Sequence, residues 1–213
     1  FALAPQLAEL KRLETLTLEK TDFKTLPAEI FQILSLKKLD LSYLNTKLTA
    51  LPDEIGNLYN LEYLDIAHNA LETLPPGFGK LIQLKELHAQ GNALKSLPKE
   101  FGYLILLEKL YFCEGYLGNW LATLPPEFGN LSALQELSLC ANHVKEFPEP
   151  LLKLRNLRKL DLGVNQLKTL PDDIRNLTRL QTLTLAGSPI SQEEIKRVRG
   201  LLPQTTVVFG EDD

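Results

Sequence analysis

Several residue types and patterns are scarce in this chain of 213 residues, and each scarcity excludes a class of protein. Two cysteines are too few for a disulfide framework. The longest apolar runs, such as residues 104–107, are far too short to span a bilayer. The 23 basic and 27 acidic residues are spread along the chain and form no basic stripe for phosphate contacts. We therefore expect no membrane insertion and no nucleic-acid partner.

The beginning of the chain also lacks familiar features. No charged segment followed by an apolar stretch marks a signal peptide, and methionine is absent throughout. Pro5, Leu7 and Leu10 resemble the return segment of a preceding repeat, so we expect the chain to begin inside a repeat with further sequence upstream. Cysteines that could staple the ends, which are frequent in secreted repeat proteins, are missing. Their absence slightly favours the cytoplasm and leaves the location open.

Leucine, in contrast, supplies 49 of the 213 residues and recurs with a fixed period. Seven prolines each follow a leucine or a phenylalanine, at successive intervals of 25, 23, 23, 27, 23 and 23 residues. A period of this size means that one supersecondary unit is copied several times. We expect one extended domain, because the period is unbroken. The prolines are Pro27, Pro52, Pro75, Pro98, Pro125, Pro148 and Pro171.

The stretch LEYLDIAHNALETLPPGFGKLIQL shows the unit, which follows the pattern LxxLxLxxNxLxxLP. Leu64 and Ile66 alternate at strand spacing, and the apolar spacing widens after Pro75, as expected for a short helical or irregular return. Asn69 falls where the chain must turn, and its amide can hydrogen-bond backbone groups there. The frame predicts eight parallel strand units. They start at Leu13, Leu36, Leu61, Leu84, Leu107, Leu134, Leu157 and Leu180.

The phrases LPDEIGNLYNLEYLDIAHNAL and LPPEFGNLSALQELSLCANHV resemble the leucine-rich repeat family, in its regular 23-residue class with the consensus LPxxIGxLxxLxxLxLxxNxL. The resemblance covers nearly the whole chain. It implies an α/β repeat fold, a curved solenoid with a parallel concave sheet of about eight strands. The class is common in bacterial proteins and in intracellular scaffolds. The motif is specific for the fold and says little about function.

The C-terminal segment departs from the repeat. Ser191 and Glu194 form the S-x-x-E of a capping box, and apolar residues then recur at helical spacing. We expect a helix over 191–202 that covers the last repeat, a short strand over 205–209 and a disordered acidic tail over 211–213. The predicted division is therefore repeats over residues 1–190 and a cap over 191–213.

Side chains that alternate with the strand leucines face the concave side of the predicted sheet, and an aromatic group of them falls on repeats two to five. Aromatic side chains on a rigid exposed surface are frequent anchors of protein interfaces. Scattered surface aromatics are also normal, so it is their clustering that favours a site. The predicted members are Tyr43, Tyr63, Asp65, His68, His88 and Tyr111.

Two repeats are longer than the others, and their extra residues, in SYLNT and CEGYLGNW, fall between a strand and its turn asparagine. Insertions in repeat proteins tend to lie on one face, often the binding face, although loops also tolerate insertion at little cost. We expect both loops to protrude from the same edge and to flank the aromatic group. The longer one adds Tyr116 and the only tryptophan, Trp120, to the predicted partner-binding residues.

Metal, catalytic and disulfide chemistry are each disfavoured. Asp65, His68 and His88 have ligand side chains, but we expect Asp65 and His68 at opposite ends of one strand. His88 beside Asp65 is the only plausible acid–base dyad, and such pairs on repeat sheets are usually solvated hydrogen bonds. Cys113 and Cys140 lie on consecutive rungs, but adjacent parallel strands rarely provide the disulfide dihedral, so we expect free thiols. We predict no metal, no cofactor and no enzyme activity.

A stack of repeats builds an extended surface more readily than a catalytic cleft. The sequence therefore predicts a monomeric, non-catalytic protein–protein interaction module that binds a protein on its concave face and inserted loops. A rigid, preformed surface loses little conformational entropy on association. The alternative is a ligand-sensing or targeting domain of a larger multidomain signalling or effector protein.

Overall fold

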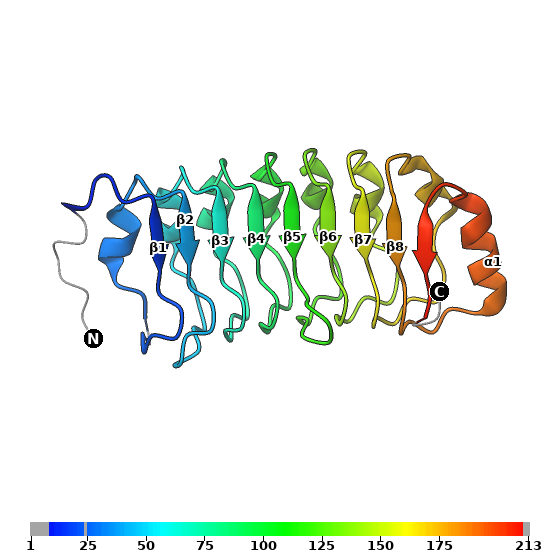
Figure 1. Ribbon diagram of the computed structural model, residues 1–213, viewed down its shortest axis with the longest axis horizontal. Helices are drawn as coiled ribbons and strands as arrows, with labels where there is room; N and C mark the ends of the chain where they lie inside the picture. The colour runs from blue at the N-terminus through cyan, green and yellow to red at the C-terminus, as the bar shows by residue number, and fades with distance from the viewer. Residues whose placement is uncertain (1–8, 24, 211–213) are drawn as a thin grey trace.

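The computed structural model describes residues 9–23 and 25–210, so the expectations for Pro5, Leu7 and the acidic tail lie outside the described residues. Within them the chain forms an elongated stack in which all strands run the same way, side by side (Figure 1). The strands join in sequence order into one parallel sheet. They are β1 (Thr15–Thr17), β2 (Lys38–Asp40), β3 (Tyr63–Asp65), β4 (Glu86–His88), β5 (Lys109–Tyr111), β6 (Glu136–Ser138), β7 (Lys159–Asp161), β8 (Thr182–Thr184) and β9 (Thr206–Val208).

The eight strand units that the leucine period predicts are confirmed as β1 to β8. Their register places equivalent repeat positions opposite one another, so that Leu64 pairs with Leu87 and Leu87 with Leu110. The strand that follows the predicted cap helix is β9, and it extends the same sheet beyond the last repeat. The described sheet therefore has nine strands.

The return segments are short 3-10 helices. Each begins immediately after a repeat proline, and the proline that precedes each of η3 to η8 has an extended backbone. Proline has no N–H to donate and is therefore tolerated at the start of a helix but not in its interior. The helices line the side of the stack opposite the open face of the sheet (Figure 1). They are η2 (Ala28–Gln32), η3 (Asp53–Asn57), η4 (Pro76–Lys80), η5 (Lys99–Tyr103), η6 (Pro126–Asn130), η7 (Glu149–Lys153) and η8 (Asp172–Asn176).

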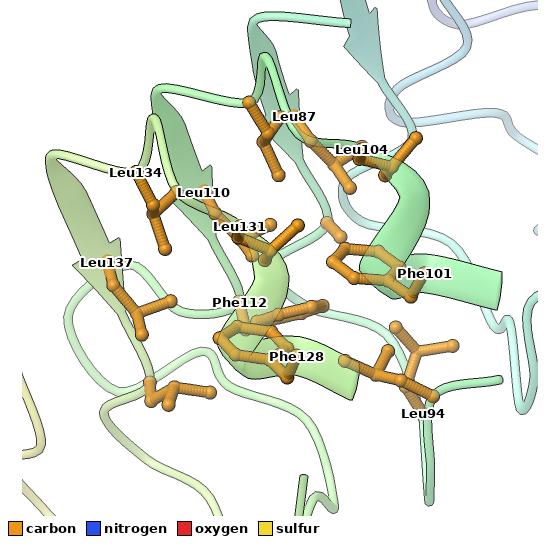
Figure 2. Close-up of a cluster of buried hydrophobic side chains, with 14 of the residues drawn as sticks. Leu87, Leu94, Phe101, Leu104, Leu110, Phe112, Phe128, Leu131, Leu134 and Leu137 are labelled. Atoms are coloured by element: carbon orange, nitrogen blue, oxygen red, sulfur yellow. The ribbon is translucent and has the colours of Figure 1, made fainter. Parts of the chain in front are cut away.

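A single apolar core runs between the sheet and the 3-10 helices. The central leucines of β2 to β8 are fully buried, Leu16 of β1 is partly buried, and a column of phenylalanines continues from one repeat to the next (Figure 2). The ring of Phe101 stacks on Phe78 and on Phe128, with 5.9 Å between centroids in both pairs. Each repeat therefore buries its apolar face against its neighbours, as expected for a solenoid.

Buried asparagines tie the turns of adjacent repeats together. The Oδ1 atom of Asn92 accepts the N–H of Leu71 at 3.0 Å, and its Nδ2 atom donates to the carbonyls of Ile66 at 3.0 Å and Ala89 at 3.2 Å. Asn69, Asn119, Asn142 and Asn165 make the equivalent bond to the preceding repeat. The turn asparagine of the sequence pattern thus satisfies backbone groups that no strand partner reaches.

The C-terminal helix α1 (Gln192–Leu201) confirms the expected cap helix, and Ser191 accepts the N–H of Glu194 at its N-terminus. The carboxylate of Glu194 does not complete a capping box. It accepts the N–H of Leu170 at 2.8 Å and pairs with Arg197, which fastens α1 to the last repeats. Within the described residues, no helix is long and apolar enough to cross a membrane.

Candidate functional site

Three rings lie side by side on the open face of the sheet, which we call the sheet face. Tyr63, His88 and Tyr111 come from β3, β4 and β5, and we call them the aromatic stripe. The centroids of Tyr63 and His88 are 5.3 Å apart, and those of His88 and Tyr111 are 4.8 Å apart. The ammonium group of Lys38 lies 4.2 Å from the centroid of Tyr63, at cation–π distance. The register of the parallel strands therefore produces a continuous, half-buried aromatic surface.

Carboxylates surround the aromatic stripe. Glu86 Oε1 lies 2.8 Å from Nε2 of His88, and Glu86 Oε2 lies 3.4 Å from Nζ of Lys109. The hydroxyl of Tyr111 donates to Glu136 at 3.2 Å. These bonds hold the ring of His88 and the hydroxyl of Tyr111 in defined positions, so the surface is preorganised.

Aspartates repeat in the central column of the sheet face. Asp40, Asp65 and Asp161 each accept, through Oδ1, the backbone N–H two residues further along at 2.9 Å. This bond fixes each carboxylate and leaves the second oxygen of the group for other partners. Among the described residues, that oxygen of Asp65 accepts a single long bond, of 3.5 Å, from the hydroxyl of Tyr63.

Partial burial raises the pKa of two tyrosines and one aspartate on the sheet face. Burial, reinforced by Asp65, raises the pKa of Tyr63, and burial, reinforced by Glu136, raises the pKa of Tyr111 to about 12. Burial also raises the pKa of Asp65, although the N–H of Ala67 and the proximity of His88 oppose the shift. Because desolvation disfavours the charged form, both tyrosines remain neutral hydrogen-bond donors at neutral pH.

Tyr43 and His68 form a second ring pair beyond the carboxyl ends of β2 and β3. Their rings stack with 3.9 Å between centroids, and Tyr43 remains 45% exposed. Lys47 donates to the carbonyl of His68 at 2.6 Å and fastens the shorter insertion to the next repeat. Burial lowers the pKa of His68, although Glu114 opposes the shift, so a neutral imidazole stacks under the tyrosine.

The longer insertion folds into a small turn after β5. Glu114 and Leu117 exchange backbone hydrogen bonds of 3.1 and 3.0 Å. Gly118 packs so closely on the next repeat that a Cβ atom there would lie 1.7 Å from the carbonyl oxygen of Ala141. Tyr116 at the tip is 78% exposed, so the loop presents an aromatic side chain on a docked backbone.

The two insertions follow β2 and β5, and both protrude at the carboxyl edge of the sheet (Figure 1). Trp120 is 54% exposed and lies under Lys95, whose ammonium group is 5.7 Å from the ring centroid. Among the described residues, no ring contact connects Tyr116, Trp120 or Tyr43 with the aromatic stripe. The structure thus divides the predicted site into a central stripe and two separate edge features.

The acid–base pair that the sequence suggested does not form. Asp65 and His88 are register partners, but Nε2 of His88 bonds to Glu86. His68 does not lie on β3 at all, because the strand ends at Asp65. In the described part of the chain, Asp65, His68 and His88 do not come close enough together to share a metal ion.

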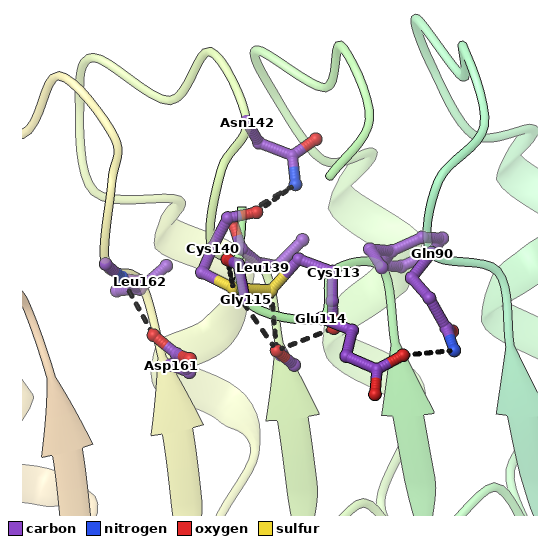
Figure 3. The surroundings of a disulfide bond; sticks show 12 residues. Gln90, Cys113, Glu114, Gly115, Leu139, Cys140, Asn142, Asp161 and Leu162 are labelled. Carbon is purple, nitrogen blue, oxygen red and sulfur yellow. Dashed lines mark hydrogen bonds between the residues drawn. A yellow bond between two sulfur atoms is a disulfide. The ribbon is translucent and has the colours of Figure 1, made fainter. Parts of the chain in front are cut away.

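The prediction of free thiols is wrong. Cys113 and Cys140 are joined in a disulfide across neighbouring repeats, with a Cα–Cα distance of 5.5 Å (Figure 3). Both residues lie beyond the last strand residues, Tyr111 and Ser138. The N–H of Glu114, next to Cys113, donates to Leu117 within the longer insertion, whereas Leu139 and Ala141 on either side of Cys140 still donate to the next repeat. The chain at Cys113 therefore departs from the parallel geometry on which the prediction rested. Cysteine usage consequently gives no support for a reducing compartment.

Four charged residues belong to the site in the structure but were not among the predicted site residues, although the sequence pattern places them in the concave columns. They are Lys38, Glu86, Lys109 and Glu136. The signal was present, because equivalent repeat positions become neighbours in a parallel sheet. Distances between side-chain tips, in contrast, cannot be obtained from column order. The same applies to Asp161, which the structure brings to the two cysteines.

Comparisons with known proteins agree with this architecture. A family profile described as leucine-rich repeat region matches residues 32–115, and a second, leucine rich repeat, matches residues 132–190. No curated protein matches the chain in sequence.

Solved structures share the fold. An internalin (inlF) from Listeria monocytogenes superposes on 99% of this chain with a TM-score of 0.82 and 22% identity. The ectodomain of the plant membrane receptor kinase GASSHO1/SCHENGEN3 from Arabidopsis thaliana matches 97% of it with a TM-score of 0.66 and 26% identity. A TDR receptor matches 98% of it with a TM-score of 0.74 and 26% identity. This chain spans 58%, 28% and 40% of those chains, respectively. From its repeats, its sheet and these matches, the chain belongs to the leucine-rich repeat family.

Proposed function

We propose that this protein binds an extended, cationic segment of a protein partner on its sheet face. The aromatic stripe forms the centre of contact, and Asp65 supplies a carboxylate beside it. Tyr43 with His68 and Tyr116 with Trp120 form the rim at the carboxyl edge. The observation that carries the proposal is the continuous row of preorganised rings flanked by fixed carboxylates.

The charge of the sheet face supports a cationic partner. Its two columns within the strands carry five carboxylates and three lysines, an excess of two negative charges with histidine neutral. Two of the lysines, Lys109 and Lys159, already pair with Glu86 and Glu136. A guanidinium group could stack on a tyrosine ring while it donates to the open oxygen of Asp65.

A rigid surface of this kind suits binding more than catalysis. The rings and carboxylates are held by the strands and by mutual hydrogen bonds, so little side-chain entropy is lost on association. Aromatic side chains then supply most of the contact energy. The leucine-rich repeat ectodomain of GASSHO1/SCHENGEN3, which is similar in fold, was solved in complex with CASPARIAN STRIP INTEGRITY FACTOR 2.

Display selection of random linear peptides tests the proposal, because it requires no identified partner. We expect peptides enriched in arginine or lysine, with affinities that fall roughly 10-fold or more in Tyr63→Ala or Tyr111→Ala, as for an interface hot spot. The matched control is Tyr59→Ala, since Tyr59 is 46% exposed but follows η3 on the opposite side of the stack. Circular dichroism confirms that each variant is folded.

Two results would contradict the proposal. Selected peptides without cationic enrichment, whose affinity does not depend on salt, would remove the role of the carboxylates. Equal affinity for wild type and Tyr63→Ala, with loss in Tyr59→Ala, would move the site to the other face.

A second candidate is a targeting or ligand-sensing domain within a longer protein. It is favoured by the matches to solved structures, because this chain covers only 58%, 28% and 40% of the lengths of those chains. The same sheet face would then deliver an attached domain to its partner. Determining the complete open reading frame distinguishes this candidate from a self-contained binding protein.

A further inference from the structure

Two sulfur atoms and a carboxylate meet at the carboxyl edge of β5, β6 and β7. Cys113 and Cys140 occupy the same column on neighbouring repeats, and Asp161 ends the next strand, β7 (Figure 3). One potential ligand atom from each residue lies within 4.8 Å of the other two. Within the described residues, this is the group of three cysteine, histidine or acidic side chains that is compact enough to share a metal ion.

Neighbouring polar groups contact the sulfur atoms and orient the carboxylate. The Oγ atom of Ser138 lies 2.7 Å from Sγ of Cys113 and 3.8 Å from Sγ of Cys140. The carboxylate of Asp161 is oriented by the N–H of Gly163 at 2.9 Å. A cavity of about 190 Å³ on the sheet face is lined by Ser138 and Asp161, and neither cysteine lines it. The cysteines themselves are buried, at 3% and 4% exposure.

We propose that this cluster, when its cysteines are reduced, binds one divalent metal ion of the zinc class. The two thiolates and the carboxylate of Asp161 are the protein ligands, and the hydroxyl of Ser138 or a water completes four-coordination. Thiolate and carboxylate are both zinc ligands, at about 2.3 and 2.0–2.2 Å. Ligand atoms of such a tetrahedral site lie roughly 3.5–3.8 Å apart. The three side chains, whose ligand atoms lie within 4.8 Å of one another, are near that spacing once the S–S bond is broken.

The disulfide and the metal site exclude each other, because each uses both sulfur atoms. A dithiol reductant breaks the S–S bond, transfers two electrons and two protons to the two sulfurs, and itself becomes a cyclic disulfide. Metal binding then releases the two thiol protons to solvent as the thiolates form. Strands β5 to β7 are joined by their own backbone register, so we expect the ligands to stay on the same scaffold in both states.

Cobalt(II) titration of the full chain tests the site. The protein is reduced with dithiothreitol, freed of reductant under anaerobic conditions and titrated with Co²⁺ alone. We expect thiolate-to-cobalt charge-transfer absorption that saturates at one equivalent and is abolished by Zn²⁺. The oxidised protein and Cys113→Ser should lack the saturating two-thiolate spectrum.

A matched pair of aspartate variants tests the third ligand. Asp161→Asn should weaken Co²⁺ binding roughly 10-fold or more and change the d–d spectrum, since an amide is a poor zinc-class ligand. Asp65→Asn should change neither, because Asp65 has the same column position and the same backbone hydrogen bond but lies far along the sheet.

Three results would each overturn the proposal. They are the absence of charge-transfer absorption in reduced protein that circular dichroism shows to be folded, unfolding of the protein on reduction, and unchanged affinity and spectrum in Asp161→Asn.

Discussion

Replacing Asn92 with alanine should strongly destabilise the stack, because this side chain joins two turns. Asn92 is 8% exposed, and its amide bonds to the N–H of Leu71 and to the carbonyls of Ile66 and Ala89. The substitution leaves the N–H of Leu71 buried without this partner, at about 1–3 kcal/mol. Each of the two lost carbonyl bonds adds about 0.5–1.5 kcal/mol. The free energy of unfolding should therefore fall by about 2–6 kcal/mol.

The two carbonyls keep a second donor, which favours the lower part of this range. Ile66 also accepts from Asn69, and Ala89 also accepts from Asn119, so neither becomes an unsatisfied acceptor. The cost therefore depends mainly on the orphaned N–H of Leu71, which the alanine side chain cannot reach.

Urea denaturation, followed by circular dichroism and by the fluorescence of Trp120, measures this cost. The matched control is Asn60→Ala, because Asn60 donates to the carbonyl of Leu34 at 2.9 Å in an exposed position. We expect the control to change stability by less than about 1 kcal/mol. A loss of less than about 1 kcal/mol in Asn92→Ala would refute the argument that the asparagines carry buried bonds between repeats.

Three further substitutions probe the core, the disulfide and a buried carboxylate. Phe101→Ala removes the fully buried central ring of the phenylalanine column and should lower the free energy of unfolding, measured by urea denaturation, by about 3–5 kcal/mol. A loss as small as that at an exposed residue would be inconsistent with the stacked column. Cys113→Ser removes the disulfide to Cys140, which closes a loop of 27 residues, and should lower the free energy of unfolding by about 2–4 kcal/mol. Reduction of the wild type should lower it by a similar amount. Identical denaturation curves would argue against a structural disulfide. Burial raises the pKa of Asp161 above its ordinary value of 3.8. As pH falls, the folded state therefore takes up a proton before the unfolded state does. The contribution of this carboxyl group to stability accordingly falls as pH rises from the unfolded-state pKa through the folded-state pKa. Asp161→Asn should therefore have a higher Tm than wild type near about pH 7 and lose that advantage near about pH 3; the opposite trend would mean that the carboxylate is stabilised in the fold.

The repeat period predicted the fold well because it is a property of the whole chain. Leucine spacing fixed which side chains are buried, and the turn asparagines and Ser191 marked where strands and the last helix begin or end. Column order also placed Asp65, His88 and Tyr111 on adjacent strands, as their register confirms. In an in-register parallel sheet, residues at equivalent repeat positions lie next to one another on neighbouring strands.

The disulfide and the hydrogen-bond partners of the site could not be predicted, because they depend on side-chain geometry that the repeat does not encode. Cys113 and Cys140 lie past the last strand residues, and the insertion changes the path of the chain at Cys113, so ideal parallel-strand geometry did not apply to the pair. His88 bonds to Glu86 on its own strand instead of Asp65 on the neighbouring one. Repeat position does not determine which of several nearby partners a side chain bonds to, and the role of the site residues stays a prediction.

Photocrosslinking tests the central claim, that the sheet face binds a cationic segment, most directly. A benzophenone amino acid replaces Tyr111 on the sheet face or Tyr103 on η5, and the probe is the tightest cationic peptide from display selection. Tyr103 is 54% exposed and Tyr111 is half-buried, so position 103 would crosslink more if exposure alone determined the yield. We expect crosslinks from position 111 that excess unlabelled peptide suppresses, and none from position 103. Crosslinks from position 103 alone would contradict the claim.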